Sequence, residues 1–367
     1  MRAALPALLL LLTPLNARPQ NHAPTPAEIA LDSHTYDLQT NGRIFLLSEA
    51  KKNNYFLLGE LHGDNEIPAL LHTLWPDLWH NGYRYVAAEV SPWTADQLES
   101  ANPSEHIEGL WTRRQADDLH AIAGPRSHIL WGCDMEEIHP EYLIRELARL
   151  NPAYPSLQQM DALTKSGYQR SMTAQLLQLA AAPPQHDKTI NDISLYKSLL
   201  ATLQIDSFRS VPTTKMAAQQ DREQLMKTQF LAHLRAHAPA RVLLRFGRNH
   251  LHRGYDARGI STLGNFIAEF ALSRGETTFN VGAFGAGGKA TLMGETFSMD
   301  ETADEPTFAL LASRAKYAAT VFDLRPLRPF LHAIPQEKRT PLESTLIYWS
   351  DAYDAIICYK NVTPLSE

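Results

Sequence analysis

The sequence alternates short apolar runs with stretches of helical period, and this alternation restricts its fold more than any other feature. The apolar runs predict strands at 55–58, 83–88, 128–131, 241–246, 278–284, 318–324 and 354–359. Apolar residues that recur every three or four positions predict helices at 67–79, 140–150, 213–237 and 261–272. Strands that alternate with helices predict an α/β fold, in which helices flank a central, mostly parallel sheet.

Composition and charge exclude several classes of protein. The chain has 367 residues, of which 44% are hydrophobic, and this is enough apolar surface for a sizeable core. Its net charge is −6 and it has no run of Lys or Arg, which argues against a nucleic-acid partner. Two cysteines cannot form a disulfide scaffold or a Cys-rich zinc site. We expect Cys133 and Cys358 to be buried free thiols, and a disulfide between them is the alternative.

The N-terminal segment predicts export. Arg2 precedes an almost entirely apolar stretch at 5–15, so we interpret 1–17 as a signal peptide and the Pro-rich segment 18–26 as a flexible leader. The apolar stretch is shorter than the roughly 20 residues that a membrane span needs. We therefore expect a periplasmic or secreted protein without a membrane span after cleavage, and an uncleaved anchor is the alternative. The rest, 27–367, is predicted to be a single α/β domain with a helical insertion at about 154–205.

Ionisable residues follow four of the predicted strands. In chain order they are Glu60, His62 and Glu66, then Glu89, then Asp134, and finally His250 and His252. Ligands of open α/β sheets bind beyond the carboxyl ends of the strands, so parallel neighbouring strands would bring these groups into one cleft. If the chain stays extended there, Glu60 and His62 share a face, and so do His250 and His252.

Imidazole beside carboxylate suits hydrolysis in two ways. We predict Glu60, His62, Glu89 and His250 as catalytic residues. If a metal is bound, the same four residues are its ligands, and they suit Zn, Mn, Fe or Co, which would supply hydroxide near neutral pH. Without a metal, His62 would act as general base on water, oriented by Glu60 or Glu89.

Other chemistry is less favoured by the sequence. The alternation that points Asp134 into the cleft points Cys133 away from it, which argues against a cysteine nucleophile. No Gly-x-Ser-x-Gly motif is present, which argues against a standard serine hydrolase. The glycine cluster at 285–288 predicts a turn rather than a dinucleotide-binding loop.

Three motifs resemble the superfamily that contains erythromycin esterases, haem-binding ChaN proteins and Tiki metalloproteases. They are the segment 57–63 (LLGELHG), Glu89 after the next strand, and the segment 247–250 (GRNH). In addition, Arg222 and Glu223 followed by Met226 are similar to an Arg-Asp/Glu-x-x-Met signature of that group. The resemblance implies an α/β fold with a cleft at the strand ends. It also implies Glu60, His62, Glu89 and His250 as site residues, with Arg222 as a supporting residue.

Together these observations predict an exported hydrolase that cleaves an ester or peptide bond in a small-molecule or peptide substrate. Asp134, Arg222, His252 and Glu66 are predicted to support the site. The resemblance also implies an alternative, a periplasmic protein of the ChaN type that binds haem or another metal complex through Tyr and His. A third hypothesis is a structural or interaction protein with a decayed site.

Overall fold

A computed structural model describes residues 25–100, 111–124, 128–137, 139–181, 190–237, 239–292 and 294–365. The signal peptide predicted at 1–17 and all but the last two residues of the leader lie outside these ranges. Within them, no helix combines the length and the apolar character that crossing a bilayer requires.

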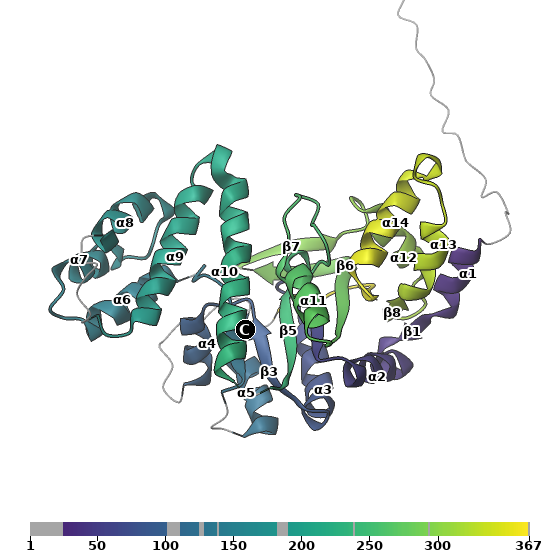
Figure 1. Ribbon diagram of the computed structural model, residues 1–367, viewed down its shortest axis with the longest axis horizontal. Coiled ribbons are helices and arrows are strands. Elements are labelled where there is room, and N and C mark those ends of the chain that lie inside the picture. The colour runs from purple at the N-terminus through teal and green to yellow at the C-terminus, as the bar shows by residue number, and fades with distance from the viewer. Residues whose placement is uncertain are drawn as a thin grey trace, which may run out of the picture.

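The described strands form one nine-stranded sheet at the centre of the fold (Figure 1). They are β1 (Thr35–Asp37), β2 (Tyr55–Glu60), β3 (Tyr83–Ala88), β4 (Leu130–Gly132), β5 (Arg241–Gly247), β6 (Thr278–Leu292), β7 (Glu295–Asp300), β8 (Ala319–Asp323) and β9 (Ala355–Tyr359). Their order is β1-β8-β9-β6-β2-β5-β3-β4, and β7 pairs with β6 outside this path. The pairs from β9 to β4 are parallel, whereas β8 and β1 add an antiparallel edge.

Helices flank this sheet, which confirms the predicted α/β fold. They are α1 (Pro26–Ser33), α2 (Arg43–Lys52), α3 (Glu66–His80), α4 (Pro92–Glu99), α5 (Arg113–Ala123), α6 (Pro140–Leu150), α7 (Pro155–Thr164), α8 (Thr173–Ala181), α9 (Ile193–Arg209), α10 (Lys215–Ala236), α11 (Leu263–Ser273), α12 (Pro306–Arg314), α13 (Arg328–His332) and α14 (Pro341–Ala352). Short 3₁₀ turns include η2 (Arg170–Met172), η3 (Pro212–Thr214) and η4 (Arg248–His250). The helices expected at 67–79, 140–150, 213–237 and 261–272 are α3, α6, α10 and α11.

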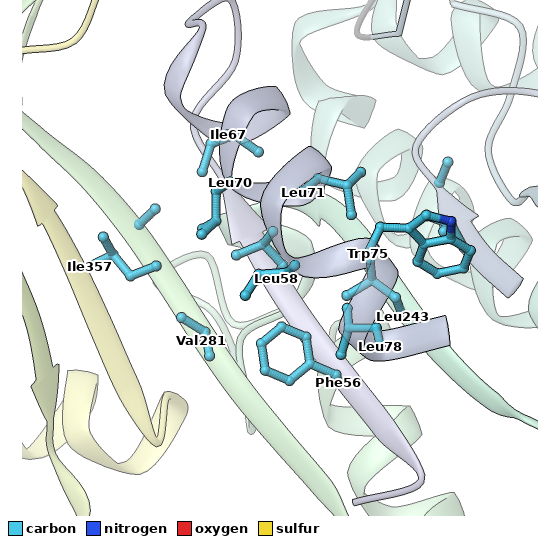
Figure 2. Close-up of a cluster of buried hydrophobic side chains, with 14 of the residues drawn as sticks. Phe56, Leu58, Ile67, Leu70, Leu71, Trp75, Leu78, Leu243, Val281 and Ile357 are labelled. Atoms are coloured by element: carbon cyan, nitrogen blue, oxygen red, sulfur yellow. The ribbon is translucent and has the colours of Figure 1, made fainter. Parts of the chain in front are cut away.

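The apolar face of α3 packs on one side of the sheet and holds β2 in place (Figure 2). Its buried residues recur at helical spacing: Ile67, Leu70, Leu71, Leu74, Trp75 and Leu78. Phe56 and Leu58 of β2 join the same cluster, whereas Leu57 belongs to the cluster on the opposite side. Each fully buried large apolar side chain contributes roughly 1.5–3 kcal/mol. Because alternate strand residues share a face, Glu60 continues the side of Phe56 and Leu58.

The segment from 154 to 205 contains α7, η2, α8 and most of α9. These helices pack with α6 around a separate apolar cluster that includes Leu143, Leu157, Leu176 and Leu199. The group lies beside the sheet, on the left in Figure 1, and α9 contacts α10. Through that contact, the end of α9 and the start of α10 lie near each other.

The prediction of a turn at 285–288 is wrong, because strand β6 continues through these residues to Leu292. The pairing between β6 and β7 shifts register between Ala286 and Lys289, which is a local irregularity of the strand rather than its end. Gly288 has a φ of +97°, and a Cβ there would lie 2.1 Å from the carbonyl oxygen of Val362. The glycines therefore let a continuous strand bend and pass close to the backbone of the C-terminal segment.

Candidate active site

The carboxyl ends of β2 and β5 place the first site residues next to each other. These strands are parallel neighbours, with Glu60 paired to Gly247 and Leu58 paired to Arg245. Glu60 and Arg245 lie on the same side of the sheet, and the Glu60 carboxylate accepts a hydrogen bond from Arg245 Nε at 2.5 Å. Both side chains are buried and therefore shielded from water, so the two opposite charges stabilise each other.

Two further residues hold Arg245 in place. Its Nη1 donates to Gln115 Oε1 at 2.7 Å, and its guanidinium lies 4.2 Å above the centre of the Trp111 ring. Gln115 belongs to α5, so this helix helps to fix the orientation of Glu60 at the end of β2.

His62 follows β2 and is the more exposed of the two site imidazoles. Its side chain is 29% exposed, whereas that of His250 is 8% exposed. The Nδ1 atom lies 3.3 Å from Glu60 Oε1 without hydrogen-bond geometry, and Nε2 lies 3.8 Å from Glu89 Oε2, beyond hydrogen-bond distance. Burial lowers the pKa of His62, but the two carboxylates outweigh it and the net shift is upward.

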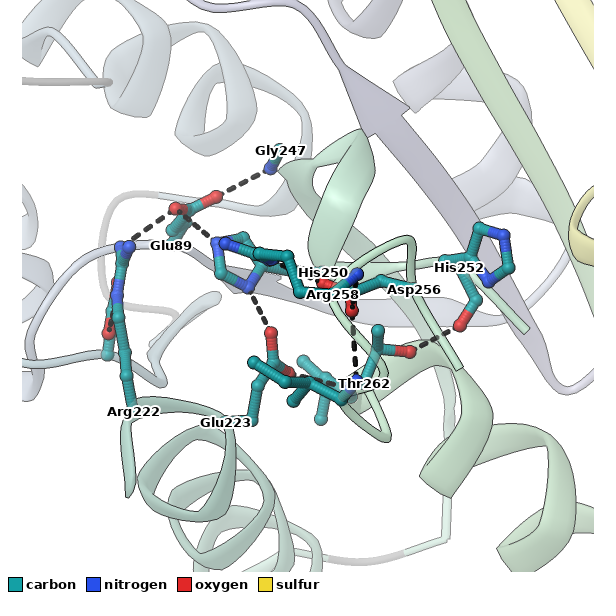
Figure 3. A network of polar contacts seen from close by, with 12 residues as sticks. Glu89, Arg222, Glu223, Gly247, His250, His252, Asp256, Arg258 and Thr262 are labelled. Carbon is teal, nitrogen blue, oxygen red and sulfur yellow. Dashed lines mark hydrogen bonds and ion pairs between the residues drawn. The ribbon is translucent and has the colours of Figure 1, made fainter. Parts of the chain in front are cut away.

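Glu89 follows β3, and Figure 3 shows its carboxylate joined by dashed lines to Arg222, Gly247 and His250. Its Oε2 accepts the backbone N–H of Gly247 at 2.5 Å, and its Oε1 accepts Arg222 Nη2 at 2.9 Å. The same Oε1 lies 3.3 Å from His250 Nε2. Burial raises the pKa of this carboxyl, but the charges of His250, His62 and Arg222 hold it well below its ordinary value.

His250 is enclosed between two carboxylates. It ends the short turn η4, and its Nδ1 lies 2.5 Å from Glu223 Oε1 on α10. Glu223 Oε2 accepts the N–H of Leu263 at 2.8 Å, which ties the pair to the first residue of α11. Burial lowers the pKa of His250, but Glu89 and Glu223 together raise it to about 10, so the ring is an imidazolium at neutral pH.

Arg222 of α10 joins the ends of β3 and β4. Its Nε donates to both oxygens of Asp134, at 3.0 and 3.1 Å, and its Nη2 bonds to Asp134, Glu89 and Glu137. Burial raises the pKa of Asp134, Arg222 lowers it, and the net shift is upward. Arg222 and Asp134 therefore lie beside the site, where they support Glu89.

The structure does not bring His252 and Glu66 into this network. The expectation that His250 and His252 share a face is wrong, because η4 turns the chain by about 120° per residue and the chain is not extended there. The His252 ring lies 4.4 Å from that of Tyr348 on α14, and neither ring nitrogen has a hydrogen-bond partner among the described residues. Glu66 opens α3 and accepts hydrogen bonds from Thr363.

The sequence does not predict three groups that belong to the site in the structure, namely Arg245, Glu223 and the backbone N–H of Gly247. Arg245 stands in the apolar run of β5, and an isolated charge in such a run is a signal that it pairs with another buried charge. Glu223 belongs to the Arg-Asp/Glu-x-x-Met-like motif, but the motif alone gives it no role. A backbone N–H leaves no signal in the sequence.

Three of the four predicted metal ligands, Glu60, Glu89 and His250, already have other groups of the protein bonded to them or facing their donor atoms. Both nitrogens of His250 face carboxylates. Glu60 accepts a hydrogen bond from Arg245, and Glu89 accepts hydrogen bonds from Arg222 and the Gly247 N–H. In the described part of the chain, no group of three or more His, Cys, Asp or Glu is arranged to hold a metal. Metal binding and haem binding both stay predictions.

Cys133 and Cys358 are buried and not joined in a disulfide. Burial and the neighbouring Asp134 raise the pKa of Cys133 well above its ordinary value, so the group is held as a thiol. A thiol of this kind is a poor nucleophile.

Comparisons with known proteins identify the fold from solved structures, whereas comparisons of sequence find no match. The chain matches no family profile and no curated protein sequence. A Bacillus cereus protein of solved structure is 16% identical, with a TM-score of 0.61 over 92% of this chain and 97% of its own. A succinoglycan biosynthesis protein is 13% identical, with a TM-score of 0.59 over 92% and 96%.

A third solved structure is a histidine-to-asparagine variant of the erythromycin esterase EreC in its open conformation. It is 14% identical to this chain, with a TM-score of 0.57 over 90% of this chain and 95% of its own. The chain therefore has the α/β fold of the erythromycin esterase, as the motifs predicted.

Proposed function

We propose that this chain is an exported hydrolase of ester or peptide bonds, in which His62 is the general base that activates water. The observation that carries the proposal is the position of His62. It is partly exposed and lies between Glu60 and Glu89, whereas His250 is buried and engaged on both sides. Of the two imidazoles, His62 is therefore the one that a substrate and water can reach.

The carboxylate of Glu60 sets the proton position on His62. Because Glu60 Oε1 faces Nδ1, it favours the tautomer that carries its proton there and leaves a lone pair on Nε2. A water molecule gives a proton to Nε2 as its oxygen attacks the carbonyl carbon. The tetrahedral intermediate then collapses, and the leaving oxygen or nitrogen takes that proton from His62.

The charges around His62 favour this step. Within the described network, five carboxylates outnumber four cations by one; they are Glu60, Glu89, Asp134, Glu137 and Glu223 against Arg209, Arg222, Arg245 and His250. An additional positive charge on His62 is therefore stabilised as it forms in the transition state. In this mechanism His250 and Arg222 are positioning residues, because they hold Glu89 and do not reach the reacting water.

The shared fold supports hydrolysis, since a neighbour with that fold is an erythromycin esterase. Support for export comes from the apolar segment at 5–15 after Arg2. If the chain is exported, N-terminal sequencing of the mature protein should begin near Arg18, and an intact Met1 in the cytoplasmic fraction would argue against it.

The proposal is tested by replacing His62 with Asn and assaying a panel of 4-nitrophenyl esters and peptide 4-nitroanilides. Loss of a general base should lower kcat by roughly 10²–10⁴-fold. His72→Asn is the matched control, because His72 is on α3 and its side chain is 66% exposed. The melting temperature of both variants should stay near that of the wild type. Full turnover in His62→Asn, or an equal loss in His72→Asn, would refute the role of His62.

A further inference from the structure

A pocket lies beside the network, at the end of α9 and the start of α10. Its volume is about 380 Å³, and it draws its lining from segments that are distant in the sequence. The lining residues are Glu137, Arg170, Arg209, Lys215, Met216, Gln219 and Arg258. Four of these seven residues are cations.

Most of the positive charge in this pocket is already paired. Arg209 bonds to Glu137 at 2.8 Å and lies 3.6 Å from Asp206, which also lies 3.6 Å from Arg170. Arg258 contacts Asp256 at 2.6 Å. Each of the three arginines in the lining therefore has a carboxylate partner, and Glu137 also pairs with Arg222.

Lys215 carries the remaining positive charge, since it forms no ion pair with any described residue. It is exposed and is the first residue of α10, a helix of 22 residues whose N-terminus no side chain caps. The positive end of the helix dipole adds to the charge of Lys215. The pocket thus has the electrostatic character of a site for a single negative charge.

Glu137 connects this pocket to the candidate active site. One of its oxygens bonds to Arg209 inside the pocket, and the other lies 2.9 Å from Arg222 Nη2. The same Nη2 lies 2.9 Å from Glu89. A ligand in the pocket is therefore separated from Glu89 by the side chains of Glu137 and Arg222.

We infer that this pocket binds a singly charged oxyanion group of the substrate, a carboxylate or a sulfonate-like group, and that the hydrolase prefers anionic substrates. That the bound anion belongs to a substrate rests on the proposed function, whereas anion binding by the pocket does not depend on catalysis. Lys215 and the N-terminus of α10 would contact the anion, and Arg258 and Arg170 would border it.

The experiment measures binding without turnover. Calorimetric titrations on the full chain use two aryl ketones, which have no scissile bond. They compare 6-(4-nitrophenyl)-6-oxohexanoic acid with 1-(4-nitrophenyl)hexan-1-one, which has the same length and no charge. A third ligand carries a sulfonate in place of the carboxylate and shows which oxyanion the pocket prefers. We expect the wild type to bind the better anionic ligand about tenfold more tightly than the neutral one, as one charge-assisted contact allows.

Lys215→Gln should remove most of this preference and leave the affinity for the neutral ketone unchanged. Lys197→Gln is the matched control, since Lys197 is exposed on α9 and does not line the pocket. Equal binding of charged and neutral ligands, or a preference that survives Lys215→Gln, would overturn the inference. This result is independent of whether His62 is catalytic, which the corresponding 4-nitrophenyl esters test separately.

Discussion

Gly247 packs so closely against His62 that adding one methyl group should disable the site. A Cβ at this position would lie 2.6 Å from His62 Nε2, 3.0 Å from its Cε1 and 3.2 Å from Glu89 Oε2. The backbone of Gly247 has φ −51° and ψ 137°, values that alanine adopts without strain. Gly247→Ala therefore acts on the site residues and not on the backbone.

The size of the effect follows from the distance that the ring must move. Ordinary contact begins near 3.4 Å, so His62 has to shift by about 0.8 Å. A displacement of about 1 Å in a catalytic group can cost roughly 10²-fold in rate. The ring is partly exposed and can move toward solvent, and Gly→Ala also restricts the unfolded chain. We therefore expect a change in unfolding free energy within about 1 kcal/mol.

The assay combines kcat on the best 4-nitrophenyl ester with urea unfolding of Gly247→Ala, His62→Ala and the double variant. The double variant should be no less active than His62→Ala, since both changes act on one group. Gly247→Ala should lower the unfolding free energy less in the His62→Ala background than in the wild type, because the imidazole that it clashes with is absent. An active Gly247→Ala, or a loss of activity matched by a loss of several kcal/mol of stability, would refute this reasoning.

Three further predictions concern buried charges and imidazoles. Arg222→Met should leave the buried Asp134 carboxylate without its cation and Glu89 with His250 alone, and lower the unfolding free energy by about 3–5 kcal/mol; an unchanged urea midpoint would contradict this. The pKa of His250 is about 10 in the fold and about 6.5 when unfolded. Its stabilisation is therefore complete below pH 6.5 and is lost as pH rises through 10, so the urea midpoint should fall over this range less steeply in His250→Asn. The pKa of His252 is about 4 in the fold, so the wild type should lose stability as pH falls from 6.5 to 4. His252→Phe should be more resistant to acid and keep its turnover, and a loss of turnover would place His252 in the site after all.

Local pattern in the sequence is enough to predict the strands that carry the site. An apolar run or a helical period is a property of neighbouring residues, so β2, β3 and β5 lie close to their predicted positions. The carboxyl ends of parallel strands meet at one edge, and for this reason the sequence alone groups Glu60, His62, Glu89 and His250.

The tertiary structure decided the partners of these residues and the direction in which each one points. Glu60 pairs with Arg245 across 185 positions of sequence, and no local pattern encodes a contact of that separation. The turn η4 separates His252 from His250, because the chain stops being extended earlier than the alternation implies. The pocket around Lys215 collects side chains from five parts of the chain, and its unpaired positive charge is evident only once the ion pairs around it are known. Composition and spacing are one-dimensional, whereas compensation between buried charges is set by distances in the folded chain.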